Sequence, residues 1–264
     1  MPKTRYLKTY ASRNIRGKRK VCRYLEQNEI TRLFVPPTAM LSKKRLLAML
    51  SDHGTVYVKP DIGSQGIGVG RVKQSEHGYS LDTTANKKQV HKTFGTAEEL
   101  IAYLNRNNRH KVIVQAAIEL DTVGPNERPY DIRSMVQRKP GGKWTCTGFL
   151  VKVGSPNKIV TNYYQGGKIW PIDKLWMRKQ LPESERQDRI NELRLASLRI
   201  ARTLSRKRSG MHEMGIDFAY DKNNRLWVLE VNSNHPQFHP LKKIKPDEYK
   251  KMVRFARSYG RFDD

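Results

Sequence analysis

The chain has 264 residues, 37% of them hydrophobic, and this length can bury one large core or two small ones. No run of 18 apolar residues occurs, so we expect no membrane span, and the basic N-terminus lacks the apolar stretch of a signal peptide. Two cysteines, Cys22 and Cys146, are too few for a disulfide framework. These features predict a globular protein of the cytoplasm.

The charge of the chain is strongly positive. Lys and Arg number 51 against 25 Asp and Glu, a net charge of +26, which exceeds what solubility requires and indicates an anionic partner. The excess is steepest before residue 59, and segment 13–23 carries six basic side chains. An anionic polymer, an acidic peptide, an acidic lipid surface and nucleic acid are candidate partners, although no RNA-binding signature or zinc spacing occurs. The alternative is a solvated basic surface.

Cap and turn signals predict the elements in chain order. In the first half they are a helix over 15–26, an extended segment over 34–37, a helix over 43–50 capped by Ser42, strands over 56–59 and 69–72, and a helix over 97–106 capped by Thr96. In the second half they are strands over 111–118, 131–138 and 143–153, a helix over 183–206, a hairpin over 215–232 and a helix over 247–259. We expect three parts, over 1–50, 51–240 and 241–264.

The predicted hairpin carries two carboxylates and an amide in otherwise apolar strands. With the turn at 221–224, Asp217 lies opposite Val228 and diagonally from Glu230. Alternation then puts Val228, Glu230 and Asn232 on the same face as Asp217. Two close carboxylates need a proton or a cation, and Mg²⁺ prefers such oxygen ligands. The alternative is a polar edge that faces solvent.

A glycine-rich loop follows the predicted strand that ends at Lys59. The residues of this loop that could approach a phosphate are Gly63, Ser64, Gln65, Gly66 and Gly68. Backbone N–H groups of such a loop form an anion-binding nest, and Lys59 would add a positive charge. No Gly-Lys-Ser/Thr follows, so the loop is not a Walker A motif. Alone it could be only a tight turn, but together with the carboxylates downstream it indicates a phosphate and metal site.

In these motifs the chain resembles the ATP-grasp superfamily and, within it, the YheC/YheD-type spore-coat-associated family. The resemblance covers 34–238 and rests on Tyr57-Val58-Lys59-Pro60 with the glycine loop, Val112-Ile113-Val114-Gln115, Pro129-Tyr130-Asp131-Ile132-Arg133, Val160-Thr161-Asn162 with Gly166-Gly167, Gly215-Ile216-Asp217 and Leu229-Glu230-Val231-Asn232. It implies an α+β ATP-grasp fold, in which two subdomains clamp ATP between sheets, and it implies an association with spores.

The resemblance also implies roles for single residues. Asp217, Glu230 and Asn232 would hold Mg²⁺, and Lys59 and the glycine loop would bind the ATP phosphates. The strand residues Gln115, Ala116, Ala117 and Ile118 would border adenine, mainly through backbone groups, because Ala116 stands where the family usually has Glu. Asp131 would lie near the ribose, Asn162 near the nucleotide, and Arg133 near the phosphoryl group. For Asp131 and Arg133, which share a strand face, the alternative is a structural ion pair or an outward polar face.

The implied reaction joins a carboxylate to an amine through an acyl-phosphate and forms ADP, with Lys59 and Arg133 as catalytic residues. A kinase acting on a hydroxyl and a nucleotide-binding structural protein of the spore coat are the alternatives. Family ligases usually carry a substrate-binding domain before the lysine strand, where about 50 residues stand in this sequence. We therefore expect a large or anionic acceptor supplied from outside. Segment 13–23 is expected to bind its partner separately from the nucleotide.

Overall fold

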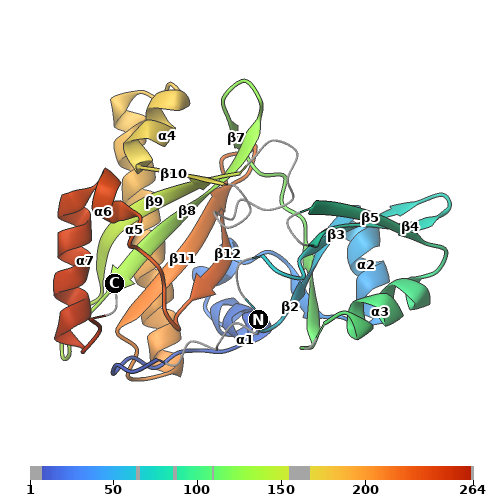
Figure 1. The fold of residues 1–264 in the computed structure, drawn as a ribbon, viewed down its shortest axis with the longest axis horizontal. Coiled ribbons are helices and arrows are strands. Elements are labelled where there is room, and N and C mark those ends of the chain that lie inside the picture. Colours follow the sequence, from blue (N-terminus) through green and yellow to red (C-terminus); the bar gives the residue numbers. More distant parts are fainter. Residues whose placement is uncertain (1–7, 64–65, 86–87, 109, 155–166, 263–264) are drawn as a thin grey trace.

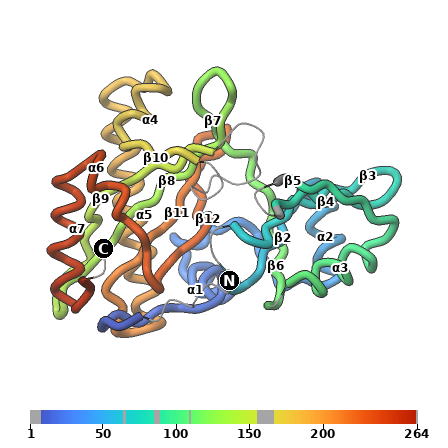
Figure 2. The backbone as a smooth tube through the Cα atoms, viewed as in Figure 1, coloured from blue at the N-terminus to red at the C-terminus, as the bar shows by residue number. Residues whose placement is uncertain are grey.

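The structure is a computed structural model that describes residues 8–63, 66–85, 88–108, 110–154 and 167–262. Ser64, Gln65 and Asn162, which were assigned to the nucleotide site, lie outside the described residues. The chain forms two lobes, each built on an antiparallel sheet (Figure 1). Helix α1 (Lys18–Glu26) lies at the junction of the lobes and contacts strands of both sheets (Figure 2).

The N-terminal lobe is a six-stranded sheet in the order β1-β6-β2-β3-β4-β5 with two helices. Its elements are β1 (Thr38–Met40), α2 (Lys43–His53), β2 (Thr55–Pro60), β3 (Gly70–Ser75), β4 (Gly78–Ala85), β5 (Lys88–Phe94), α3 (Ala97–Arg106) and β6 (Val112–Ala116). The Ser42 hydroxyl caps α2, and Thr96 and Glu99 form a capping box on α3. Leu46 and Leu100 of these helices pack on buried valines of the sheet.

The C-terminal lobe holds the second sheet, in the order β10-β9-β8-β11-β12, with β7 paired to β8. Its strands are β7 (Thr122–Val123), β8 (Arg128–Gln137), β9 (Thr145–Val153), β10 (Lys168–Trp170), β11 (Glu213–Tyr220) and β12 (Leu226–Asn232). Its helices are α4 (Ile172–Arg178), α5 (Glu183–Lys207), α6 (Leu241–Ile244) and α7 (Pro246–Ser258), and a 3-10 helix, η1 (Thr31–Phe34), packs beside them.

Strand alternation gives the C-terminal sheet two different faces. On one face, Ile132 and Ile216 join a core with residues of α5 and with Leu25 of α1. On the other face, Met135 packs against Met252 of α7 and other apolar residues. Helix α7 covers only part of this second face, and the remainder carries the charged residues described below. Both ends of the described chain thus pack into the C-terminal lobe (Figure 1).

The register of the β11–β12 hairpin differs from the predicted one. Asp217 lies directly opposite Glu230, whereas Phe218 lies opposite Val228, because a β-bulge falls between these two pairs. The extra residue on β12 is Leu229, and it turns Val228 toward the apolar face. The predictions that Asp217 faces Val228 and that Val228 shares the face of Glu230 were therefore wrong. The bulge brings the two carboxylates closer than the predicted diagonal would.

Most predicted helices and strands are present, with ends shifted by a few residues, and α3 has the predicted ends. The sequence did not indicate the β4–β5 hairpin, whose strands are largely polar and in which Leu81 is the one buried hydrophobic among the described side chains. The segment predicted as extended over 34–37 begins inside η1, and β7 lies between the predicted strands over 111–118 and 131–138, where no element was predicted. Within the described ranges no helix is both long and apolar enough to cross a membrane.

Candidate functional site

A network of opposite charges lies on the uncovered face of the C-terminal sheet. Arg133 of β8 donates from Nε and Nη2 to the two carboxylate oxygens of Asp217, at 2.7 and 2.8 Å. Lys152 of β9 places Nζ 2.9 Å from Asp217 and 2.7 Å from Asp131. The ladder explains this grouping, because Arg133 pairs with Asp217 and Asp131 pairs with Lys152. Two carboxylates and two cations therefore hold one another in fixed positions.

The network is buried and determines the charge of its members. Asp131 and Asp217 are 2% and 5% exposed. Burial alone would raise the pKa of Asp217, but the charges and hydrogen bonds of Arg133 and Lys152 outweigh it and hold that pKa well below its usual range. Asp217 is therefore an anion at neutral pH. Asp131 and Arg133 are both ion-paired on the face that carries Glu230, but Asp131 pairs with Lys152 and Arg133 pairs with Asp217.

Glu230 and Asn232 lie on β12 next to this network, and both share the face of Asp217. The Glu230 side chain is 37% exposed and places Oε1 3.4 Å from Nζ of Lys18. The amide oxygen of Asn232 accepts the backbone N–H of Asn234 at 3.1 Å. Of the two carboxylates among the predicted metal ligands, Glu230 is thus more accessible than Asp217.

Lys59 faces this region from the N-terminal lobe. It lies near the end of β2 and donates from Nζ to Oε1 of Gln115 at 2.7 Å, while Gln115 donates to the hydroxyl of Thr38 at 2.8 Å. Burial lowers the pKa of Lys59 to about 8, the nearby Glu230 opposes this shift, and Lys18 adds to it. The proposed phosphate lysine and the proposed metal carboxylate are therefore close enough to influence each other across the junction of the lobes.

The glycine loop connects β2 to β3, and its described residues require glycine at two positions. Gly66 and Gly68 have φ of +69° and +73°, the left-handed region. A Cβ at Gly68 would also lie 2.8 Å from the ring of Pro60. At the start of the loop, the carbonyl oxygen of Gly63 accepts a hydrogen bond from Lys18 Nζ at 3.0 Å. The loop therefore starts beside the lysine that contacts Glu230.

Lys18 is a member of the site that the sequence did not indicate. It begins α1, where the carbonyl oxygen of Asp61 accepts its N–H and a carboxylate oxygen of Asp61 accepts the N–H of Arg19, at 2.9 and 2.8 Å. Gly17 precedes it with φ +98°, and a Cβ there would lie 2.8 Å from that carboxylate. These contacts fix the start of α1 against the glycine loop.

The position of Lys18 corrects the interpretation of segment 13–23. Lys18 contacts Gly63 and Glu230, and Arg19 forms an ion pair with Glu26 at 2.8 Å. Two of the six basic side chains of this segment are therefore bound within the molecule. The expectation that the segment is separate from the predicted nucleotide site was wrong for Lys18, because Lys18 contacts both Gly63 and Glu230.

Lys152 is a second member of the network. From the sequence it is a possible addition to the site, but a lysine on a predicted strand is more often a surface charge. The strands that contain Asp131 and Lys152 were both predicted, with the Pro140-Gly141-Gly142 turn between them. Pairing these strands around that turn could have placed the lysine near the carboxylate. The structure shows that this pairing also contains a bulge between Met135 and Val136.

The strand expected to border adenine is β6 and the residues after it. Gln115 is 4% exposed, and its side chain is engaged by Lys59 and Thr38. The N–H groups of Ala116 and Ala117 donate to the carbonyl oxygens of Pro37 and Thr55. Adenine contacts at this strand would therefore use carbonyl oxygens of these residues or backbone groups of Ile118.

The oxygen donors fit Mg²⁺ by their chemistry. Asp217, Glu230 and Asn232 supply two carboxylates and an amide oxygen on one face of two adjacent strands. The described residues contain no cluster of three or more His, Cys, Asp or Glu side chains suited to a metal. Arg133 and Lys152 already neutralise Asp217. Glu230 and Asn232 would therefore be the main ligands, with Asp217 as an additional carboxylate.

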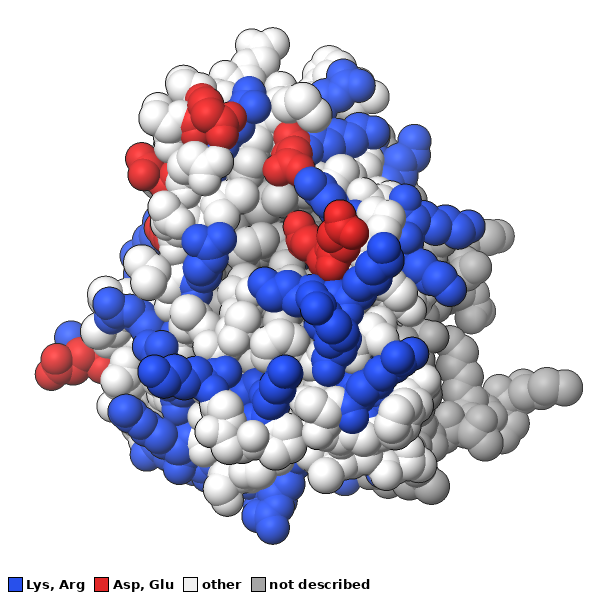
Figure 3. All heavy atoms as spheres, turned by 90° about the vertical axis from the view of Figure 1, so that its left-hand side faces the viewer, with Lys and Arg blue, Asp and Glu red and all other residues white. Residues whose placement is uncertain are grey.

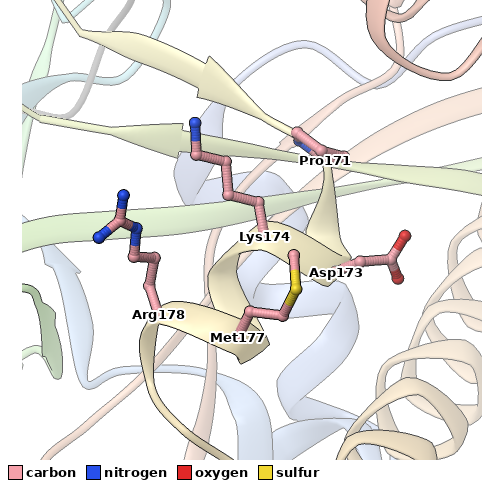
Figure 4. Close-up of a pocket in the computed structure, with 5 residues that line it drawn as sticks. All are labelled: Pro171, Asp173, Lys174, Met177 and Arg178. Atoms are coloured by element: carbon pink, nitrogen blue, oxygen red, sulfur yellow. The ribbon is translucent and has the colours of Figure 1, made fainter.

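A pocket elsewhere on the C-terminal lobe is separate from this site. It is lined by Pro171, Asp173, Lys174, Met177 and Arg178, on and just before α4 (Figure 4). None of the predicted site residues lines it. It therefore does not bear on the phosphate or metal assignment.

One lobe carries the glycine loop after the strand of Lys59, and the other carries the β11–β12 hairpin with Asp217 and Glu230, which we call the carboxylate hairpin. Two antiparallel lobes with these features define an ATP-grasp protein. A sequence profile described as YheC/D-like ATP-grasp matches residues 8–262, nearly the whole chain. The chain therefore belongs to the YheC/D-like ATP-grasp family. This match confirms the resemblance identified from the sequence and the predicted α+β fold.

Two curated relatives come from Bacillus subtilis (strain 168). The endospore coat-associated protein YheD is 26% identical over 226 residues, which cover 81% of this chain and 49% of YheD. The endospore coat-associated protein YheC is 21% identical over 252 residues, which cover 95% of this chain and 67% of YheC. The chain thus spans about half the length of YheD and about two thirds of YheC.

Solved structures also show similarity. Among them is N5-carboxyaminoimidazole ribonucleotide synthetase from Thermotoga maritima, with a TM-score of 0.49 and 14% sequence identity. The matched region covers 94% of this chain and 51% of that enzyme.

Proposed function

We propose that the chain binds ATP with Mg²⁺ at the junction of its lobes and uses it to join a carboxylate to an amine. Family membership supports the nucleotide. The observation that carries the proposal is the convergence of Lys59 and Lys18 with Glu230 across the junction. Two cations and an accessible carboxylate suit a phosphate chain and its metal ion.

In this proposal each residue has a defined task. Lys59 and Lys18 bind phosphate oxygens, and the glycine loop covers them and excludes water. Glu230, Asn232 and Asp217 would hold Mg²⁺, which when bound would supply positive charge against the charge that develops on the phosphoryl group. The substrate carboxylate attacks the γ-phosphate and displaces ADP, and an amine then displaces phosphate from the acyl-phosphate.

Arg133 remains a candidate catalytic residue, but Asp217 already occupies part of its guanidinium. Its guanidinium donates to both carboxylate oxygens of Asp217, so Arg133 directly holds one of the proposed metal ligands in place. Contact with a phosphoryl group would use donor groups that face away from Asp217. Asp131 is held by Lys152, and its proposed position near the ribose follows from the resemblance.

A kinase and a nucleotide-binding structural protein remain the alternative functions. A kinase would use the same MgATP site to transfer a phosphoryl group to a substrate hydroxyl. A structural protein would fit the relatives, which are named as endospore coat-associated. Incubation with MgATP and pools of carboxylates and amines, followed by mass spectrometry, separates them. Amide formation with ADP supports the ligase, addition of phosphate supports the kinase, and no product with retained ATP binding supports the structural protein.

The lowered pKa of Lys59 predicts how ATP affinity depends on pH. With a pKa of about 8, Lys59 is mostly charged at pH 7 and loses its proton as the pH rises through 8. Phosphate binds the charged form, so ATP affinity should be full below pH 8 and fall above it by up to about tenfold per pH unit. Titration calorimetry from pH 7 to 9.5 measures this decline.

Lys59→Arg is the matched variant for this measurement, because arginine stays charged over the whole range. Its ATP affinity should change much less between pH 7 and 9.5. A parent chain whose affinity is constant over this range would contradict the assignment of Lys59 to the phosphates, as would an equal decline in both proteins.

A further inference from the structure

Three segments that contain no Asp or Glu meet at one end of the C-terminal lobe. They are 138–154, 193–212 and 249–262, with four, six and five basic residues. The first contains the β8–β9 turn and β9, the second the C-terminal half of α5, and the third most of α7. In a chain of mixed charge, this exclusion of carboxylates from three separate segments produces a strongly positive region.

Side-chain contacts bring the three segments together around the β8–β9 turn. Trp144 donates from Nε1 to the hydroxyl of Ser205 on α5 at 3.0 Å. Lys139 places Nζ 5.9 Å from the ring centre of Phe255 on α7. Lys251 of α7 donates to a carbonyl oxygen of β9 at 3.5 Å. The turn thus joins two helices that pack on opposite faces of the sheet.

The basic side chains of these segments are largely exposed, and we call the exposed set the basic face. It consists of Lys139, Lys143, Arg194, Arg199, Arg202, Arg206, Lys207, Arg208, Lys250, Arg254 and Arg257. In the described part of the chain, only Lys250 of this set forms an ion pair, at 3.8 Å from Asp247. Figure 3 views the side of the lobe on which α7 lies, and Lys and Arg dominate the lower half of that view.

The spacing on α5 gives the basic face a regular row of charges. Arg199, Arg202 and Arg206 recur at helical intervals on the side opposite the buried Ile200 and Leu204. Seven residues separate the first from the last, which is about 10 Å along the helix axis. This length spans about three phosphates of one nucleic-acid strand.

We propose that the basic face binds the phosphate backbone of duplex nucleic acid without reading its sequence. Seven of its eleven residues are arginines, whose planar guanidinium donates two parallel hydrogen bonds to phosphate. Trp144 is buried and Phe255 is half-buried, and among the described aromatic side chains of the three segments only Phe262 is well exposed, at 77%. One exposed ring does not provide the row of aromatic side chains on which successive unpaired bases stack. Contacts to phosphate, which position a protein without specifying bases, are what this surface supplies.

The basic face is distinct from the proposed nucleotide site. It lies over α5, α7 and the β8–β9 turn, whereas β2 and β12, which carry Lys59 and Glu230, lie at the junction of the lobes (Figure 1). The proposal therefore does not depend on the ligase chemistry. It assigns an anionic partner to a surface other than segment 13–23, in which Lys18 and Arg19 are engaged within the molecule.

The test measures binding of a fluorescently labelled DNA duplex, about two helical turns or 20 base pairs long. One variant neutralises four residues around the turn, with Lys139→Gln, Lys143→Gln, Arg202→Gln and Arg206→Gln. A control variant neutralises four exposed residues of the N-terminal lobe, with Lys44→Gln, Lys73→Gln, Arg106→Gln and Lys111→Gln. Both variants lose four positive charges, so a difference in their DNA affinity shows which surface binds the duplex.

The parent and the control should bind the duplex, with an affinity that falls steeply as salt rises. The basic-face variant should bind at least about tenfold more weakly at 0.1 M salt, and its plot of log affinity against log salt should be shallower by about 3 to 4. Equal losses in the two variants would overturn the proposal. Binding of polyglutamate as tightly as DNA at equal charge would also overturn it, in favour of an acidic peptide.

Discussion

Glu230→Gln is expected to reduce ATP turnover by at least about 100-fold, the size of effect seen when one preorganised charge-stabilising group is lost. The substitution removes the charge of the accessible carboxylate that faces Lys18 and lies opposite Asp217, at nearly constant shape. Steady-state release of ADP at saturating Mg²⁺ measures the effect. The melting temperature should change little, because Glu230 is partly exposed and its contact with Lys18 is long.

Glu29→Gln is the matched control for this experiment. Glu29 is exposed on the loop after α1 and is not one of the proposed site residues, so the turnover of this variant should equal that of the parent. Equal turnover in Glu230→Gln and the parent would exclude Glu230 as a ligand of an essential metal ion. Loss of turnover in both variants would show that the assay reports a general effect of removing a carboxylate.

Lys152→Met is expected to destabilise the chain by about 3 to 5 kcal/mol, because it removes a cation from a buried network that contains two carboxylates. Lys152 contacts both Asp131 and Asp217, whose side chains are 3% and 7% exposed. Arg133 still neutralises Asp217, but Asp131 loses the cation opposite it. Urea unfolding at pH 7 measures the difference. Lys168→Met, on the exposed end of β10, should cost much less.

The destabilisation should depend on pH with a defined sign. The pKa of Asp217 is held below its usual range in the folded state. Its pairing therefore contributes stability above the unfolded pKa of about 4 and loses that contribution as the pH falls further. The gap between parent and Lys152→Met should be largest near neutral pH and shrink below about pH 4. A gap that grows in acid would contradict this account.

The carboxylate hairpin shows what the sequence could predict of the site. Alternation along β12 was enough to place Glu230 and Asn232 on one face, and apolar strands around a turn were enough to predict the hairpin. The exact partner of Asp217 could not be predicted, because the bulge at Leu229 depends on how the hairpin packs against α5 and the rest of the core. A shift of one residue changes which side chains face each other.

The lysines show what the sequence could not predict. Lys59 stands out because a glycine loop follows it. Lys18 lies in a run of basic residues, where nothing distinguishes it from Arg16 or Lys20. Its role follows from the docking of α1 against Asp61, a contact between segments more than forty positions apart. Such contacts depend on tertiary packing, which local patterns do not encode.

Binding of MgATP to the parent chain and to Lys59→Ala tests the central claim, a nucleotide site at the junction of the lobes, most directly. At 100 times the dissociation constant, MgATP should stabilise the parent by about 2.7 kcal/mol and raise its melting temperature by roughly 5 °C or more. Lys59→Ala should melt near the parent without nucleotide and show a much smaller shift with it. Equal shifts in both proteins, or none in the parent, would contradict the claim.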